Sequence, residues 1–181
     1  MVVDENAFSY SNIEQDAANS ILSNEKNEVR GNAFYSCNAK LGKLIIKCFI
    51  NSKYKYHFSY CSDGLSEVEY YYNNYFLDNN KNTIPVNMFD ACSNLTKAII
   101  HEGFTKCSDS IFRNCINLKT VRLPSSIVSW TQSGNTTENS SYAIFYGCGN
   151  LEDVQLGEEE NKWTQSLRLT WSNKITVESM K

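Results

Sequence analysis

Apolar residues recur along this chain with the spacing Phe-x-x-Cys-x-x-Leu-x-x-Val-x-Leu. Residues 112–123 and 145–156 match the spacing without a gap, and residues 89–100 differ only by an alanine at one apolar position. Residues 34–46 and 58–70 carry one extra residue between the cysteine and the leucine. Self-similarity at a period of about 20 to 30 residues predicts a solenoid, because one repeat cannot bury its apolar side without its neighbours.

The second half of each copy, Leu-x-x-Val-x-Leu, predicts a short strand. Its last two apolar positions alternate with polar ones, as the two faces of a half-buried strand require. Stacked copies would set these strands side by side in a parallel sheet, about 4.8 Å apart. We expect a sixth strand at residues 166–170. Residues 175–180 hold too few apolar residues to decide between strand and helix.

Residues 1–33 match the spacing poorly, and we expect them to cap the open apolar end of the first coil. The cap is predicted as a degenerate repeat or a helix. A copy with serine in place of the cysteine starts at Phe8, and a helix over about residues 12 to 22 is indicated because Ser11 and Glu14 fit a capping box. The apolar residues of that helix would share one face: Ile13, Ala17 and Ile21.

We expect the repeats to form one solenoid domain over residues 34–170, followed by a C-terminal cap or a truncated continuation at residues 171–181. Two insertions interrupt the repeats, at residues 71–82 and 129–141. Both follow the predicted strand of their repeat, so they should emerge on the same side of the solenoid. Insertions of this length are usually functional or disordered.

Composition bounds the class of protein. Of the 181 residues, 41% are hydrophobic and 20% are charged, which is enough apolar material for a core and excludes a disordered chain. The net charge is -3 and the charges are scattered, so neither a nucleic acid nor an anionic membrane is an expected partner. No apolar window approaches the roughly 18 to 20 residues of a membrane helix, and no direct membrane insertion is expected.

The first residues lack the basic start and the apolar core of a secretory signal. Two locations therefore stay open. We expect the protein at the cell surface or secreted if an export signal has been removed, and otherwise in the cytoplasm or associated with a virion.

Residues 34–170, with Leu123-Pro124 directly after the fourth strand, resemble the BspA-like leucine-rich repeats, also called Treponema pallidum-type repeats. The resemblance implies a right-handed superhelix with a parallel sheet on its concave face and short strands or turns on its convex face. It also implies adhesion and protein binding at a cell surface, and similar arrays occur in prophage-encoded proteins. The extra residue in the early copies and the two insertions depart from the family pattern.

Five of the 7 cysteines occupy one position of the repeat, so we expect them to form a column inside the solenoid. We interpret this column as packing, because cysteine is small and readily buried. Disulfides between neighbouring coils are the alternative, although parallel side chains suit the disulfide dihedral poorly. No metal and no cofactor are predicted. The residues given this structural role are Phe34, Cys37, Phe58, Cys61, Phe89, Cys92, Phe112, Cys115, Phe145 and Cys148.

Candidates for catalysis are few. Only His57 and His101 could act as ordinary general bases, and the repeat pattern sets neither of them beside a nucleophile. We therefore predict no catalytic residues and a protein that is not an enzyme, with an unrecognised hydrolase as the remaining alternative.

The better candidates are surfaces. The outward positions of the strands carry charges of alternating sign, which suits either a partner protein or a merely solvated sheet. The predicted binding residues on the strands are Glu67, Glu69, Lys97, Ile99, His101, Arg122, Gln155 and Arg168. The insertions mix large rings with polar neighbours, as binding loops do, and contribute Tyr71, Tyr72, Tyr75, Phe76 and Trp130. The alternative is that the first insertion packs back on the solenoid.

These patterns predict a non-enzymatic recognition module that binds a protein or a surface glycan through the concave sheet and the two insertion loops. The alternatives are a structural or receptor-binding component of a phage or prophage particle, and a spacer segment of a larger surface protein.

Overall fold

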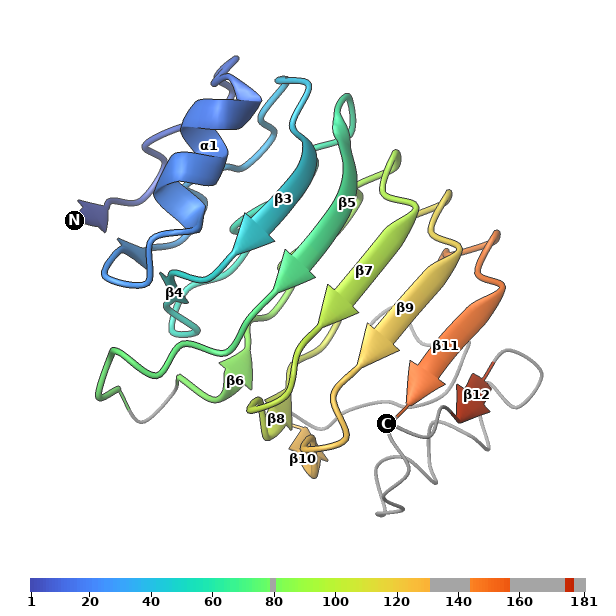
Figure 1. Ribbon diagram of the computed structural model, residues 1–181. Helices are drawn as coiled ribbons and strands as arrows, with labels where there is room; N and C mark the ends of the chain where they lie inside the picture. The colour runs from blue at the N-terminus through green and yellow to red at the C-terminus, as the bar shows by residue number, and fades with distance from the viewer. Residues whose placement is uncertain (79–80, 131–143, 157–174, 178–181) are drawn as a thin grey trace.

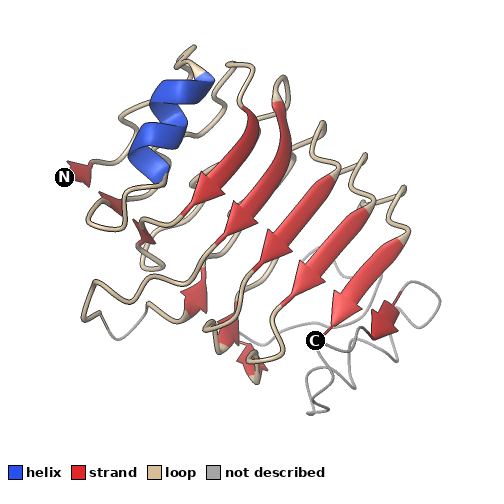
Figure 2. Ribbon diagram, in the orientation of Figure 1, coloured by secondary structure: helices blue, strands red, loops and turns tan. Residues whose placement is uncertain are grey.

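The computed structural model of the protein describes residues 1–78, 81–130, 144–156 and 175–177 (Figure 1). One helix lies at one end of a long sheet, and short strands lie beyond the ends of the long ones (Figure 2). In chain order the elements are β1 (Val2–Val3), α1 (Gln15–Leu22), β2 (Glu28–Val29), β3 (Gly42–Ile46), β4 (Phe49–Ile50), β5 (Leu65–Tyr70), β6 (Thr83–Ile84), β7 (Lys97–Ile100), β8 (Lys106–Cys107), β9 (Thr120–Leu123), β10 (Ser129–Trp130), β11 (Asp153–Leu156) and β12 (Ile175–Val177).

The long sheet is open and parallel, with the strand order β12-β11-β9-β7-β5-β3. One row of buried aliphatic side chains crosses it, because Val68 pairs with Ala98, Ala98 with Val121, and Val121 with Val154. These four residues hold the same position in the sequence pattern. The predicted strands and their parallel pairing are therefore confirmed.

The predicted position of the sixth strand is wrong. The strand beside β11 is β12, in which Ile175 pairs with Val154, and residues 166–170 lie outside the described residues. The spacing from Val154 to Ile175 is close to the spacing from Ala98 to Val121. The sequence between β11 and β12 lacks the Phe-x-x-Cys signature that precedes the other long strands.

Short strands form two further parallel sheets, in the orders β1-β2-β4 and β10-β8-β6 (Figure 1). Buried Cys107 lies in β8, away from the cysteine column. Ser129 and Trp130 form β10 and pair with Lys106 and Cys107. The second insertion therefore begins later than the sequence suggests, and residues 131–141 of it lie outside the described residues.

The turns that precede the long strands carry a column of phenylalanine rings. Successive rings stack with centroids 5.1 to 6.0 Å apart. The column runs through Phe8, Phe34, Phe58, Phe89, Phe112 and Phe145. Phe8 stacks on Phe34, as expected for a degenerate copy of the repeat at the N-terminus.

The turns of Phe8, Phe34, Phe58, Phe89 and Phe112 bend through residues with left-handed backbone two positions before and two positions after the phenylalanine. In the turn of Phe145, Gly147 has the same backbone two positions after the ring. The amide of Phe58 donates to the carbonyl of Met88 in the next turn at 2.9 Å, and the amides of Tyr56 and Tyr60 make the same kind of bond. Left-handed backbone costs a non-glycine residue roughly 1–2 kcal/mol. The residues in this conformation include Asn6, Tyr10, Asn32, Ser36, Tyr56, Tyr60, Asn87, Ala91, Ser110 and Asn114.

The cysteines of the repeat lie beside the phenylalanines as buried free thiols. Cys61, Cys92, Cys115 and Cys148 each donate a hydrogen bond to the carbonyl oxygen of the phenylalanine in the preceding turn, at 2.9 to 3.0 Å. Cys37 has only the degenerate turn before it and donates to the carbonyl of residue 11 at 3.3 Å. These cysteines form a column, and their thiols bind neighbouring turns as well as fill space.

The two early copies pair irregularly with each other at the start of their strands. The pairing of β3 with β5 shifts between Gly42 and Lys43, which leaves Ser66 outside the register. Gly64 lies so close to the previous coil that a Cβ atom there would be 2.2 Å from the carbonyl oxygen of Ala39. Only glycine allows the two loops to approach in this way.

Helix α1 is shorter than expected and buries a different face. It begins at Gln15 with Glu14 at the N-cap and has no side-chain cap, so the capping box predicted from Ser11 and Glu14 is wrong. Ser11 instead donates to the carbonyl of Phe8 within its own turn, at 2.7 Å. Because the helix starts late, its buried residues are Ala18 and Leu22, while Ile13 precedes it, Ala17 is exposed and Ile21 is half-buried.

The helix covers the edge of β3 (Figures 1 and 2). The Nδ2 atom of Asn19 donates to the carbonyl of Lys43 at 3.1 Å, and its Oδ1 atom accepts from the amide of Ile45 at 3.0 Å. One side-chain amide thus replaces the peptide group of a neighbouring strand. The first 33 residues contain both a degenerate turn and a helix.

Candidate functional site

The outward face of the long sheet carries two rows of aligned side chains, each half-buried or exposed. The first row is Lys43, Glu67, Lys97, Thr120 and Asp153, and the second is Ile45, Glu69, Ile99, Arg122 and Gln155. Neighbours in a row belong to paired strands and are close enough for their side chains to interact. The structure therefore brings the predicted strand residues together on one surface, except Arg168, which lies outside the described residues.

Glu69 is the hub of a polar cluster on this face. The ammonium of Lys43 forms an ion pair with Oε1 of Glu69, and the hydroxyl of Tyr71 donates to Oε2 at 2.9 Å. His101 Nε2 lies 3.8 Å from the same Oε2, too far for a hydrogen bond. The bond from Lys43 is the main cause that lowers the pKa of Glu69, so its carboxylate is ionised at neutral pH.

The rings of Tyr71 and His101 stack beside this carboxylate. Their centroids lie 3.8 Å apart and their planes differ by 12°. Each residue directly follows the last residue of its strand, β5 or β7, so the parallel register sets the two rings side by side. The ammonium of Lys47 lies 5.4 Å from the centroid of Tyr71, within the range of a cation–π contact. Partial burial lowers the pKa of His101, so this imidazole is neutral at pH 7.

The first insertion packs largely back on the coils. Phe76 stacks on buried Phe49 with centroids 5.0 Å apart, and Tyr72 meets Phe104 edge-on at 5.5 Å. Both rings are half-buried, whereas Tyr75 is 57% exposed. Of the predicted insertion residues in the described part, Tyr71 joins the sheet cluster, Tyr75 points to solvent, and Tyr72 and Phe76 anchor the loop.

Asn73 holds the insertion in this position. Its side chain is buried, and its Nδ2 atom donates to the carbonyls of Lys47 at 2.7 Å and Glu25 at 2.9 Å. Its Oδ1 atom accepts from the amides of Tyr75 and Phe76. The start of the loop therefore has a defined shape, which rests on two earlier coils.

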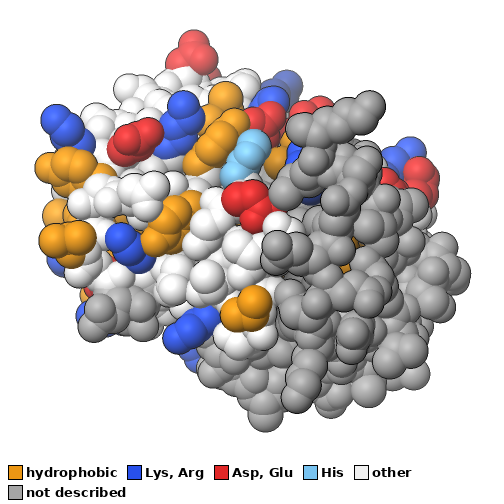
Figure 3. All heavy atoms as spheres, turned by 60° about the horizontal axis from the view of Figure 1, so that its bottom comes forward, with side chains coloured by type: hydrophobic (Ala, Val, Ile, Leu, Met, Phe, Trp, Pro, Cys, Tyr) orange, Lys and Arg blue, Asp and Glu red, His pale blue; other side chains and the backbone are white. Residues whose placement is uncertain are grey.

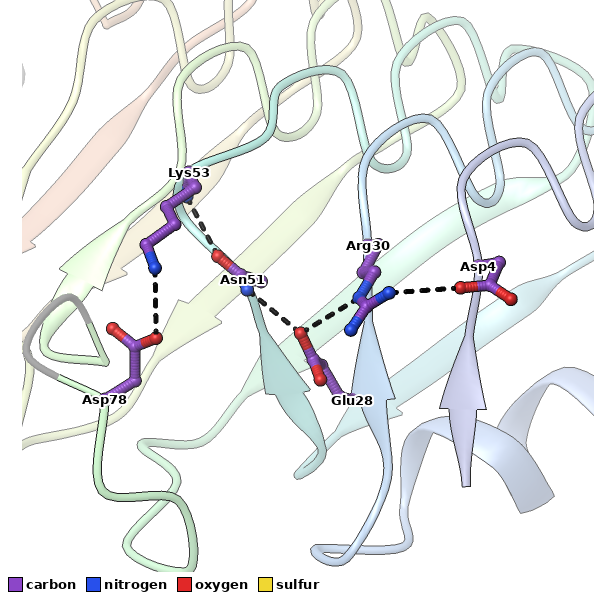
Figure 4. Close-up of polar contacts among 6 residues, drawn as sticks. All are labelled: Asp4, Glu28, Arg30, Asn51, Lys53 and Asp78. Atoms are coloured by element: carbon purple, nitrogen blue, oxygen red, sulfur yellow. Dashed lines mark hydrogen bonds and ion pairs between the residues drawn. The ribbon is translucent and has the colours of Figure 1, made fainter.

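A chain of polar contacts ties the end of the same loop to the short strands (Figure 4). Arg30 bridges Asp4 and Glu28, each at 3.3 Å. The chain continues from Glu28 through Asn51 and Lys53 to Asp78, where the last ion pair is 3.8 Å long. Exposed ion pairs contribute little free energy, typically about 0–1 kcal/mol each. We therefore assign this chain to positioning the coils and the loop.

Trp130 ends β10, and its side chain is outside the described part of the structure. Two expectations about the second insertion, its aromatic contact and its emergence beside the first insertion, stay predictions for that reason.

On the described surface in Figure 3, hydrophobic, basic and acidic side chains are interspersed. The mixture offers ring, charge and hydrogen-bond contacts together.

Sequence reasoning missed a second aromatic feature, at the turns. Tyr10, Tyr35, Tyr56 and Tyr60 line an open hollow of about 450 Å³ together with Asn6, Asn32 and Arg113. The signal was present as tyrosines one or two residues away from a phenylalanine of the column. It could not be interpreted without knowing that the side chains at these positions point outward from the turn.

Within residues 1–78, 81–130, 144–156 and 175–177, no three or more His, Cys, Asp or Glu side chains gather as a metal site. In the same part of the chain, no helix combines the length and the apolar character needed to cross a membrane.

Comparison with known protein families gives one match. A family model described as the BspA type leucine rich repeat region, in 6 copies, matches residues 3–136 and 83–167. No curated protein and no solved structure matches the chain. The match extends over the degenerate N-terminal turn as well as the repeats that contain both phenylalanine and cysteine.

Proposed function

The chain belongs to the BspA-type leucine-rich repeat family, and from this premise we propose that it binds a partner protein through the outward face of its long sheet. The family generally serves protein binding and adhesion and is typically non-enzymatic. The proposed contact surface is centred on Ile99 and includes the cluster of Glu69, Tyr71 and His101. Tyr75 adds an exposed ring on the first insertion.

The observation that carries this proposal is the row in which Ile45, Glu69, Ile99 and Arg122 lie side by side. Two half-buried aliphatic side chains alternate there with charged ones. Protein interfaces combine an apolar centre with charged and hydrogen-bonding groups around it. A row of strands also loses little conformational entropy on binding, because its backbone is already fixed by the sheet.

The stacked rings of Tyr71 and His101 supply an anchor at the end of the strands. Tyrosine is enriched among the residues that dominate binding energy, since it buries a large ring and keeps a hydroxyl for hydrogen bonding. The bond from Tyr71 to Glu69 and the ion pair from Lys43 hold this group before a partner arrives. Preorganisation of this kind lowers the cost of association.

Charge favours a protein over a nucleic acid as the partner. The first row alternates Lys43, Glu67 and Lys97, and the whole chain has a net charge of -3. A phosphate backbone requires a basic stripe instead. A surface with both signs selects its partner by matching charges, which sets specificity more than affinity.

The proposal is tested by photocrosslinking in cells of the source organism. p-Benzoylphenylalanine replaces Ile99 in one variant and Ile116 in a control. Ile116 is an isoleucine that is accessible to solvent, but it lies next to the turns and not on the sheet face. We expect a protein adduct from position 99 and none from position 116. Adducts of equal yield from both positions, or from neither, would reject the sheet face as the binding surface.

A further inference from the structure

Four tyrosine rings gather on the turn edge of the solenoid, apart from the sheet face. Tyr35 lies at their centre, with ring centroids 5.6 Å from Tyr10, 5.5 Å from Tyr60 and 6.4 Å from Tyr56. The Tyr35 ring meets those of Tyr10 and Tyr56 edge-on, at 72° and 87°. The rings therefore form the walls of a hollow and present both faces and edges to it.

Packing does not account for these rings. Tyr10 is 69% exposed and Tyr60 is 44% exposed, so neither contributes a buried side chain to the core. Tyr10, Tyr56 and Tyr60 also have left-handed backbone, with φ of 57°, 59° and 61°. Bulky residues rarely adopt this conformation, and small or amide side chains such as Asn32 and Ala91 occupy it in other turns. Strain without burial is typical of residues retained for binding.

The polar groups of the hollow come from fixed positions. Arg113 is held by Asp90, which has no exposed surface, through two hydrogen bonds, one of them 3.0 Å long from Nε. Asn87 donates a further bond to Asp90 at 3.1 Å. The guanidinium therefore reaches the hollow with its charge already compensated. Asn6 and Asn32 add side-chain amides, and the four tyrosines add hydroxyl groups.

We propose that this hollow, which we call the tyrosine hollow, binds a neutral carbohydrate. The C–H faces of a sugar ring pack on tyrosine rings, and its hydroxyls match planar amides and phenolic hydroxyls, because each sugar hydroxyl both donates and accepts a hydrogen bond. The Arg113–Asp90 pair leaves no net charge to be matched by an anionic ligand. A volume of about 450 Å³ lies within the range of small-ligand sites.

A proline-rich peptide is the competing ligand, because such peptides also dock on aromatic side chains. Such a peptide offers mainly carbonyl acceptors, because proline has no N–H, whereas a sugar hydroxyl both donates and accepts. The tyrosine hollow has rings set edge-on to one another and polar side chains on its wall. The arrangement therefore favours the sugar, and a peptide serves as a separate arm of the test.

The test uses the full chain and titrates it with maltose, cellobiose, lactose and chitobiose up to millimolar concentration, followed by calorimetry and saturation-transfer NMR. The key variant is Tyr60→Asn, since Asn114 holds the same left-handed position in a later turn. We expect at least one sugar to bind the wild type and at least tenfold weaker binding by Tyr60→Asn, with a melting temperature that is unchanged or higher. Tyr146→Ala removes an exposed ring in a later turn that does not line the hollow, and this variant should bind like the wild type.

Three results would overturn the proposal: no sugar bound at millimolar concentration, full affinity in Tyr60→Asn, or binding of a proline-rich decapeptide in place of the sugars. The test is independent of the protein partner, because Ile99 of the sheet face does not line the hollow.

Discussion

The thiol of Cys115 donates a hydrogen bond to the carbonyl oxygen of Phe89, 3.0 Å away in the preceding turn. That oxygen also accepts the amide of Cys92, so one carbonyl serves two donors from two coils. The same bond recurs at Cys148 and Phe112. Cysteine suits this position because it is small and apolar and still carries a weak donor. The repeat therefore uses cysteine to join successive turns.

Cys115→Ala should lower the free energy of unfolding by about 1–2 kcal/mol, because it removes a buried sulfur atom and this bond. Cys107→Ala is the matched control. Cys107 is equally buried, but its contact with the carbonyl of Ser108 is a weak 3.8 Å. Urea denaturation in the presence of a reductant measures both variants. Equal losses would show that the thiol bond to the preceding turn adds nothing to packing.

Asn19→Ala should open the edge of β3. The substitution leaves the amide of Ile45 and the carbonyl of Lys43 without their side-chain partner, and we expect a loss of about 1 kcal/mol together with faster hydrogen exchange at Ile45. An exposed edge also pairs readily with other chains, so sedimentation should detect self-association. Ser20→Ala on the exposed side of α1 is the control. Unchanged exchange at Ile45 in Asn19→Ala would contradict this assignment.

His57 should make the protein less stable in mild acid. Burial lowers the pKa of His57 to about 3 from an ordinary value of 6.5, so the unfolded chain binds the proton more readily. Stability is therefore complete above pH 6.5 and falls as the pH drops from 6.5 toward 3, by about 1.4 kcal/mol per pH unit. Urea denaturation at several pH values between 7.5 and 5 measures this slope.

His57→Met should reduce the slope to the part that His101 contributes, because the pKa of His101 is lowered as well. Methionine is the replacement because Met88 holds the equivalent position before the phenylalanine of the next turn. The carboxylates of Glu69 and Glu102 do not interfere. Their pKa values are lowered, so the stability that they contribute is lost only below their ordinary range near 4.5. A variant that keeps the full pH dependence would show that His57 is not its source.

The sequence pattern was sufficient for the features that repeat. Each phenylalanine, each cysteine of the column and the strand that follows them have one environment in every coil, so one rule predicts them all. Strand β12 was misplaced because its coil lacks the Phe-x-x-Cys signature. The helix face was misjudged because the start of α1 depends on its contact with β3.

The parts of the candidate site that sequence could not predict depend on contacts between coils. Tyr72 and Phe76 turn inward because Phe104 and Phe49, from other coils, offer rings to pack against. Likewise, the stacking of Tyr71 on His101 follows from the register of β5 and β7. The tyrosine hollow required the left-handed backbone of the turns, which no spacing of apolar residues reveals.

The affinity of the crosslinked partner for Ile99→Lys, measured beside Ile116→Lys, tests the proposed binding face most directly. A lysine at position 99 would set a charge in the apolar centre of the face, and melting curves of both variants verify that they are folded. The account predicts binding at least about tenfold weaker for Ile99→Lys, roughly 1.4 kcal/mol, and unchanged binding for Ile116→Lys. Equal affinity of the two variants would contradict it.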